Sequence, residues 1–212
     1  MKSMKWLTVA ALLAGLAVGT AQANPSFSLG AGASYWQLLD KDVRHELDAD
    51  GMWGASIYPR LWFTEYVGME VRASGYAYQD DTSYRDSETG EKVDVDMTLT
   101  CGSLELGLLL KLPVADTPLS VYGGAGGGYY YFDVDFDVDY HHHRHSWHHD
   151  KSYSYKLDDV FGWWGMAGVK LNLTDHFALF GEGRYVGVKP ESDGEKYDFS
   201  SVQYVLGLTY DF

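Results

Sequence analysis

The sequence predicts an all-β fold: an eight-stranded antiparallel up-and-down transmembrane β-barrel with extended extracellular strands. Three observations predict this fold. In the last segment, large apolar side chains alternate with mostly polar or small ones, at Val202, Tyr204, Leu206, Leu208, Tyr210 and Phe212. Eight strand-like segments follow residue 23, and the connections between them alternate between short and long. An even number of strands, with short turns at one rim and long loops at the other, is typical of a membrane barrel.

The segments are delimited by their alternation and by the turn-forming residues between them. The predicted strands cover residues 26–36, 52–63, 66–79, 93–112, 119–140, 153–173, 176–188 and 199–212. The short connections are 64–65, 113–118 and 174–175, and the long ones are 37–51, 80–92, 141–152 and 189–198. No segment after residue 23 offers about 18 consecutive apolar residues, so no membrane helix is predicted.

The first 23 residues have the pattern of a secretory signal peptide. Lys2 and Lys5 form a charged head, residues 6–18 are apolar, and Ala21-Gln22-Ala23 is a small-residue cleavage site. We therefore predict a signal peptide at 1–23 and one barrel domain at 24–212.

Composition narrows the classes of partner. The formal net charge is −14 at pH 7, which excludes nucleic acid because a phosphate backbone would be repelled. The chain has 24 glycines, 5 prolines and 16% aromatic residues, a composition that favours strands. Its only cysteine, Cys101, cannot form an internal disulfide.

The connection between the fourth and fifth segments permits a register prediction. If Leu112 pairs with Leu119, one face of the hairpin carries apolar side chains that would contact lipid. These are Leu104, Leu106, Leu108, Leu110, Leu112, Leu119, Val121, Ala125, Tyr129 and Tyr131. Further along the same face the residues become Asp94, Asp96, Asp133, Asp135, Asp137 and Asp139. The face is therefore expected to leave the lipid there.

This register sets Asp96 against Asp135 and Asp94 against Asp137. Like charges directly opposite each other destabilise a strand pair. Either water screens them, or Ca²⁺ or Mg²⁺ lies between the carboxylates. Such ions would also bridge to lipopolysaccharide phosphates.

The opposite face of the predicted strands places charged residues in the lumen. These are Arg60, Glu70, Arg72, Glu105, Lys111, Lys170, Glu182, Arg184 and Asp211. Positive and negative charges are nearly balanced, and a barrel of this size is barely wide enough for its own side chains. An internally paired, occluded lumen is the main interpretation, and a narrow passage for small solutes is the alternative.

A histidine-rich segment lies in the long connection after the fifth strand. It contains His141, His142, His143, His145, His148, His149 and Asp150. Imidazole binds zinc, copper and nickel, and the aspartate would add an oxygen ligand. The segment is therefore a candidate transition-metal site, with a solvated loop that binds metal only adventitiously as the alternative.

The whole chain after the leader resembles the small eight-stranded outer-membrane proteins of Gram-negative bacteria, the OmpA-barrel, OmpX and OmpW-like group. The most specific element is the end of the chain. There Gln203, Val205, Gly207, Tyr210 and Phe212 are similar to the terminal signal that the barrel-assembly machinery reads. The resemblance implies an outer-membrane location, with long loops extracellular and both mature termini periplasmic.

From these features we expect a monomer that presents acidic, His-rich loops for surface or cation binding, or that has a structural role in the envelope. Its expected partners are outer-membrane lipid, lipopolysaccharide and, during biogenesis, the assembly machinery. Lipid-modifying enzymes occur on this fold, but no Ser or acid is placed beside His176 by the predicted pairing. We predict no catalytic residue, no enzyme activity and no required cofactor.

Overall fold

The computed structural model describes residues 25–46, 50–85, 92–141, 150–156, 158–192 and 195–212. Within these ranges the side chains of 46, 81–95, 136–156, 192 and 195 lie outside the description. The predicted signal peptide at 1–23 also lies outside the described residues.

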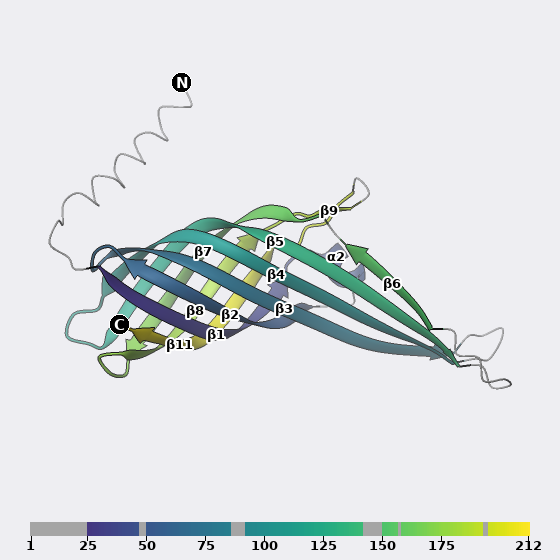
Figure 1. Cartoon of the computed structure of the whole chain (residues 1–212), viewed down its shortest axis with the longest axis horizontal. Helices are drawn as coiled ribbons and strands as arrows, with labels where there is room; N and C mark the ends of the chain where they lie inside the picture. Colours follow the sequence, from purple (N-terminus) through teal and green to yellow (C-terminus); the bar gives the residue numbers. More distant parts are fainter. Residues whose placement is uncertain (1–24, 47–49, 86–91, 142–149, 157, 193–194) are drawn as a thin grey trace, which may run out of the picture.

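Nearly all of the described chain is in antiparallel strands (Figure 1). The barrel strands are β1 (Ser26–Leu38), β2 (Gly51–Trp62), β3 (Val67–Arg85), β4 (Lys92–Pro113), β5 (Leu119–His141), β7 (Val160–Asn172), β8 (Phe177–Gly187) and β11 (Ser201–Asp211). The remaining elements are α2 (Lys41–Glu46), β6 (Asp150–Lys156), β9 (Glu191–Ser192) and β10 (Glu195–Lys196). None of the described helices is long and apolar enough to cross a membrane.

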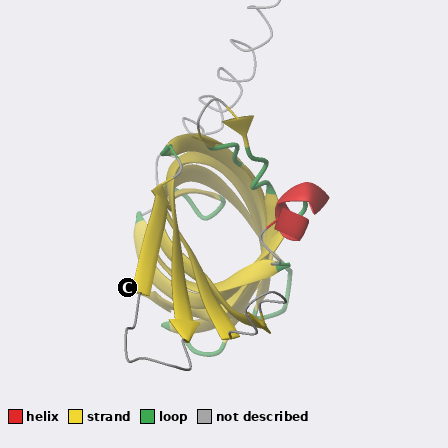
Figure 2. Ribbon diagram, turned by 90° about the vertical axis from the view of Figure 1, so that its right-hand side faces the viewer, coloured by secondary structure: helices red, strands yellow, loops and turns green. Residues whose placement is uncertain are grey.

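The sheet closes on itself, which confirms the predicted fold class. The strand order is β4-β3-β2-β1-β11-β8-β7-β5-β6, with an additional pairing of β4 with β5. Among the described strands, β6 pairs only with β5. The other eight of the nine strands form the ring. Figure 2 shows these strands encircling a common axis. Each barrel strand pairs with its neighbours in sequence, and β1 pairs with β11 to close the cylinder.

The long connections and the sixth strand contain structure that the sequence did not predict. The sequence predicts one strand over residues 153–173, but β6 ends at Lys156 and β7 begins at Val160. Both strands pair with β5: Asp133 of β5 lies opposite Lys156 of β6, and Tyr130 of β5 lies opposite Val160 of β7. The register against β5 therefore shifts by one residue between β6 and β7. A short helix, α2, follows β1, and the β9–β10 pair follows β8.

The predicted register between β4 and β5 was wrong by two residues. Leu112 pairs with Val121, not with Leu119. The turn decides this, because the N–H of Val114 donates to the carbonyl of Leu119 at 2.9 Å and the N–H of Thr117 donates to the carbonyl of Val114 at 3.2 Å. A shift of two residues leaves every side chain on its predicted face.

Large apolar side chains cover the outside of the cylinder. Leu104, Leu106, Leu108, Leu110 and Leu112 on β4 are each at least 51% exposed. Leu206 and Leu208 on β11 are exposed to a similar degree. This outward surface is an apolar belt of the kind that contacts lipid.

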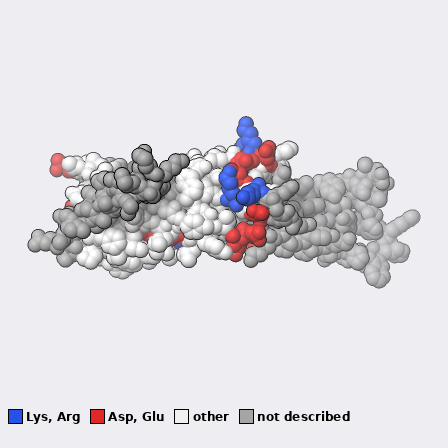
Figure 3. Space-filling view, turned by 90° about the horizontal axis from the view of Figure 1, so that it is seen from above, with Lys and Arg blue, Asp and Glu red and all other residues white. Residues whose placement is uncertain are grey.

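Aromatic pairs mark both ends of the belt. At the end with the short turns, the rings of Phe27 and Phe212 lie 5.2 Å apart, centroid to centroid. At the end with the long connections, Tyr35 contacts Trp53 at 4.9 Å, measured in the same way. Membrane barrels carry girdles of aromatic residues at both boundaries of the apolar band. Beyond the belt, charged side chains gather in a band on the face shown in Figure 3.

Candidate functional site

A network of buried charges crosses the lumen near the short-turn end. Glu70 on β3 accepts a hydrogen bond from Arg60 Nε at 2.7 Å and another from Arg72 Nε at 2.8 Å. Glu182 on β8 accepts from Arg72 Nη2 at 2.6 Å and also pairs with Arg60. All four side chains are almost fully buried. Charge-assisted bonds of this kind cross-link opposite walls of the cylinder.

Tyrosines complete this network. Tyr122 on β5 donates its hydroxyl to Glu182 at 2.8 Å. The ring of Tyr58 lies against both guanidinium groups, with centroid distances of 4.5 Å to Arg60 and 4.2 Å to Arg72. Sequence reasoning missed these two tyrosines, although both occupy inward positions of the period-two pattern and that parity could have identified them.

A second buried pair lies further from the short turns. Arg184 on β8 pairs with Glu105 on β4, and Glu105 also accepts hydroxyl bonds from Tyr130 at 3.0 Å and Ser103 at 3.1 Å. The guanidinium of Arg184 lies 4.7 Å from the ring centroid of Trp164. The second network therefore joins β4, β5, β7 and β8.

The remaining lumen charges lie close to the short turns. Lys170 Nζ lies 2.6 Å from Asp211 Oδ2, and Lys111 Nζ lies 4.3 Å from the ring centroid of Trp62. The charged residues predicted to face the lumen therefore all contact an opposite charge or an aromatic face in the described interior.

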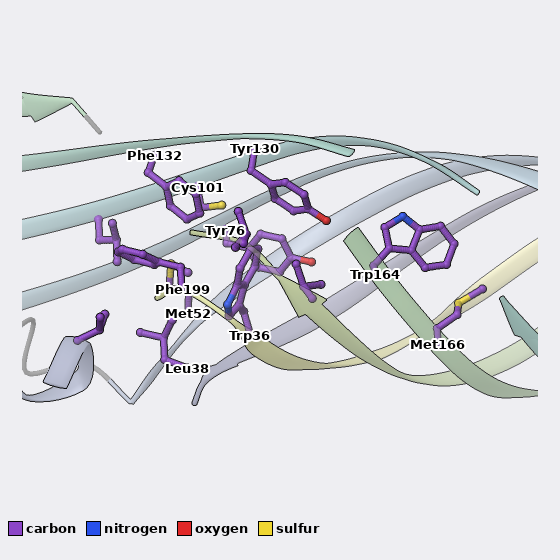
Figure 4. Packing of buried hydrophobic residues seen from close by; sticks show 14 of the residues in the cluster. Trp36, Leu38, Met52, Tyr76, Cys101, Tyr130, Phe132, Trp164, Met166 and Phe199 are labelled. Carbon is purple, nitrogen blue, oxygen red and sulfur yellow. The ribbon is translucent and has the colours of Figure 1, made fainter. Parts of the chain in front are cut away.

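An aromatic cluster fills the lumen on the other side of Glu105 (Figure 4). Trp36 meets Tyr76 edge-on at a centroid distance of 4.9 Å and Tyr130 at 6.2 Å. Phe132 packs against Phe199 at 4.7 Å. All five side chains are buried. The lumen is therefore filled by apolar packing on the side of the ion pairs that faces the long connections.

The aspartates predicted on one face lie in rows across paired strands, but their partners differ from the prediction. Asp96 pairs with Asp137 and Asp94 with Asp139, while Asp135 pairs with Thr98. The partners differ because the register between β4 and β5 is shifted by two residues from the predicted one. Asp133 is half-buried and pairs with Thr100 on β4.

The rows extend onto neighbouring strands that sequence reasoning had not included. Asp81 on β3 pairs with Asp96 on β4, and Asp150 on β6 pairs with Asp139 on β5. Backbone pairing thus sets three aspartates side by side in each row, Asp81–Asp96–Asp137 and Asp94–Asp139–Asp150. Among these six only the side chain of Asp96 lies in the described part of the chain, where it is exposed.

Most of the predicted histidine site falls on parts of the chain whose placement is not described. Residues 142–149 lie outside the described residues, and at His141 and Asp150 only the backbone is described. Among the described side chains, no group of three or more His, Cys, Asp or Glu residues is arranged to hold a metal ion.

His176, considered above as a catalytic candidate, belongs to a turn. Its Nδ1 lies 2.9 Å from the carbonyl oxygen of Asp211, and its ring stacks on Tyr210 at a centroid distance of 5.6 Å. Of the predicted assembly signal, Gln203 and Val205 are buried in the lumen, whereas Phe212 is exposed at the short-turn end. A role in assembly stays a prediction.

At the long-connection end, the exposed Lys189 forms an ion pair with the half-buried Asp198. Lys189 Nζ lies 2.5 Å from Asp198 Oδ2. The hydrogen bond to Asp198 raises the pKa of Lys189. Partial burial opposes ionisation of Asp198, but hydrogen bonds from Lys189 and Ser200 outweigh it and lower the pKa of that carboxyl. Both groups are therefore charged at neutral pH.

The comparisons with known proteins agree with this architecture. Residues 8–212 match the outer membrane protein beta-barrel domain family. The comparison with curated proteins finds no match. Among solved structures, the chain is similar to the outer membrane protein OprG from Pseudomonas aeruginosa, with 19% identity and a TM-score of 0.56, over 90% of this chain and 96% of that one.

Two other solved barrels are similar to about the same degree. A major outer membrane protein from Thermus thermophilus gives 15% identity and a TM-score of 0.54, over 89% of this chain and 99% of that one. Neisserial surface protein A gives 15% identity and a TM-score of 0.50, over the same shares. At these identities the structures show a common fold, and the family match covers almost the whole chain. The chain therefore belongs to the outer membrane protein beta-barrel domain family.

Proposed function

We propose that this outer-membrane barrel presents its acidic, His-rich extracellular end to bind cations and, through them, anionic surfaces such as lipopolysaccharide phosphates. In this function the barrel fixes the depth and orientation of the presenting strands, and the lumen transports nothing. The observation that carries the proposal is the pair of aspartate rows on the parts of β3, β4, β5 and β6 beyond the apolar belt.

The rows argue for a cation because of their spacing. Neighbouring strands lie about 4.8 Å apart, so carboxylates in one row are close enough to repel each other and to share an ion. Hard divalent cations take several carboxylate oxygens, which suits Ca²⁺ or Mg²⁺. The whole chain carries 30 Asp and Glu residues against 16 Lys and Arg residues, and this excess of acid attracts cations.

Calcium should raise the melting temperature, and replacing Asp96 and Asp137 together by Asn should remove most of the rise. A site at ~100 times its Kd adds about 2.7 kcal/mol to the stability of the folded state. Melting would be followed by circular dichroism with calcium and with chelator. Asp116→Asn, in the exposed turn between β4 and β5, is the matched control and should keep the full response. An unchanged response in the double variant would contradict the proposed site.

The histidine segment is a second proposed cation site, for zinc, copper or nickel. The pairing of Asp139 with Asp150 brings the two ends of this segment to neighbouring strands. Two ligand-rich ends held together reduce the loop entropy that a metal site must overcome.

Zinc titration of the full chain, purified without a tag, should show at least one site that is lost when the six histidines of the segment are replaced by Asn. Calorimetry measures the stoichiometry directly. A variant that replaces only His45 and His176 should bind as the parent does. If the six-histidine variant bound as much zinc as the parent, the proposed site would be contradicted.

A narrow passage for solutes is the alternative function, and the dense packing of the lumen argues against it. Salt-bridged side chains span the cylinder near the short turns, and the aromatic cluster fills it beyond Glu105. In planar bilayers the protein should therefore give no steady conductance above that of protein-free bilayers. Reproducible unitary steps across many insertions would favour the passage instead.

The buried salt bridges of the lumen also predict that removing one of their carboxylates lowers the stability of the folded barrel. Glu182→Gln leaves Arg60 and Arg72 with one compensating carboxylate, Glu70, and breaking a buried pair costs about 3–5 kcal/mol. Urea titration of the folded fraction, read from heat-modifiable gel mobility, measures the loss. Glu65→Gln, in an exposed turn, should leave the midpoint unchanged. Equal midpoints for the two variants would show that the network contributes little.

A further inference from the structure

A hollow opens on the outer wall of the barrel at the long-connection end. It has a volume of about 320 Å³, and its lining includes Phe161, Trp163, Tyr185, Lys189 and Asp198. Ligand pockets usually measure ~300–1,000 Å³, so this hollow is at the lower end of their range. It therefore has room for a single headgroup unit of a lipid.

The outward side chains of β8 place this hollow at the edge of the apolar belt. Leu179 belongs to the belt, Tyr185 follows it toward the long connections, and Lys189 lies just beyond the end of the strand. On β7, Trp163 lies beyond Val169 in the same direction. Along β8 the wall therefore changes from aliphatic to aromatic to charged, as expected at the boundary of an apolar band.

Three aromatic rings form one side of the hollow, and we call them the aromatic platform: Phe161, Trp163 and Tyr185. The first two lie across glycines of neighbouring strands. A Cβ at Gly127 would lie 2.5 Å from the Phe161 ring, and one at Gly187 would lie 2.5 Å from Trp163 Nε1. The rings of Trp163 and Tyr185 are 5.1 Å apart, centroid to centroid. Phe161 is 72% exposed and Trp163 57%, so the platform is open to a ligand.

Next to the platform, the Lys189–Asp198 pair offers both a donor and an acceptor. The ammonium has three N–H groups, and the contact with Asp198 Oδ2 at 2.5 Å uses one of them. The Lys189 side chain is 61% exposed, so its other N–H groups are accessible to a ligand. The carboxylate is held by its second oxygen, because the N–H of Ser200 donates to Asp198 Oδ1 at 3.0 Å. The pair is neutral as a unit and can donate to a phosphate while it accepts from a hydroxyl.

We propose that the aromatic platform and the Lys189–Asp198 pair bind the headgroup of one phosphorylated glycolipid of the outer leaflet, the class that includes lipopolysaccharide. A sugar ring lies on the platform, because its C–H groups carry a partial positive charge and the face of an aromatic ring is negative. A phosphate on that sugar accepts from Lys189, and a sugar hydroxyl donates to Asp198. The acyl chains of the lipid continue along the apolar belt.

The chemistry of the hollow favours a glycolipid over an anionic phospholipid. Phosphatidylglycerol has a phosphate for Lys189 and hydroxyls for Asp198, but it has no sugar ring to cover the platform. The inference shares with the proposed function the extracellular orientation of the long connections. It goes beyond that function because the site lies on the barrel wall and needs no divalent cation, since the phosphate meets the ammonium directly.

The test measures binding of diphosphoryl lipid A to the full protein in detergent micelles by native mass spectrometry, with EDTA present so that no cation bridge contributes. The parent should bind one lipid A molecule saturably. Lys189→Gln should weaken this binding roughly tenfold, the effect of one charge-assisted hydrogen bond. Phe161→Leu with Trp163→Leu should also weaken it roughly tenfold, because two ring contacts are lost.

Two control variants lie at the same end of the barrel. Lys41→Gln removes an exposed ammonium from α2, and Trp53→Leu removes an exposed indole from β2. Both should bind lipid A as the parent does, and equal binding by the site variants and the controls would overturn the proposal. The proposed function instead predicts a calcium response that depends on Asp96 and Asp137, so the chelator separates a failure of this site from a failure of that function.

A comparison of lipids on the parent keeps the proposal testable even if a site variant does not fold. In the same chelator, lipid A should bind roughly tenfold more tightly than phosphatidylglycerol, because only lipid A places a sugar ring on the platform. Equal affinity of the parent for the two lipids would refute the headgroup site.

Discussion

Closure of the strand ladder is the constraint on which the rest of the structure depends. In hydrocarbon no water is present to satisfy a backbone N–H or C=O, so a sheet that crosses a membrane cannot have an open edge. The pairing of β4 with β5 and of β1 with β11 removes the edges within the belt. A ring of this size leaves a lumen only as wide as its own side chains.

That narrow lumen explains why so many charges are buried. A charge taken out of water is stable only when it is paired and hydrogen-bonded. Arg60, Arg72, Glu70 and Glu182 pair with one another across the cylinder, and Tyr122 adds a hydroxyl. The usual arrangement of a soluble protein is inverted, with leucines outside and salt bridges inside, because the solvent of the outer wall is lipid.

The outer surface is divided by depth, and each level has its own chemistry. The apolar belt suits the hydrocarbon of the membrane, and aromatic pairs stand at its two boundaries. Beyond the boundary at the long-connection end β3, β4 and β5 continue as strands, and on β4 and β5 the outward side chains change from apolar residues to Asp96, Asp133 and Asp135. The same strands thus anchor the barrel and extend its acidic end, which links the depth of the cylinder to the position of the proposed cation sites.

The sequence by itself determined which face each side chain occupies, because the period of a strand is two and every predicted lumen charge keeps that parity. It therefore predicted the closed barrel, the leucine belt and the inward charges from Arg60 to Arg184. It did not determine which residues lie opposite one another. A shift of two residues keeps the parity, so only the hydrogen bonds of the turn between Val114 and Leu119 decided that Asp96 faces Asp137. The tertiary structure alone also decided the contact of Arg60 with Glu182, because these residues are 122 positions apart and meet only once the cylinder has closed.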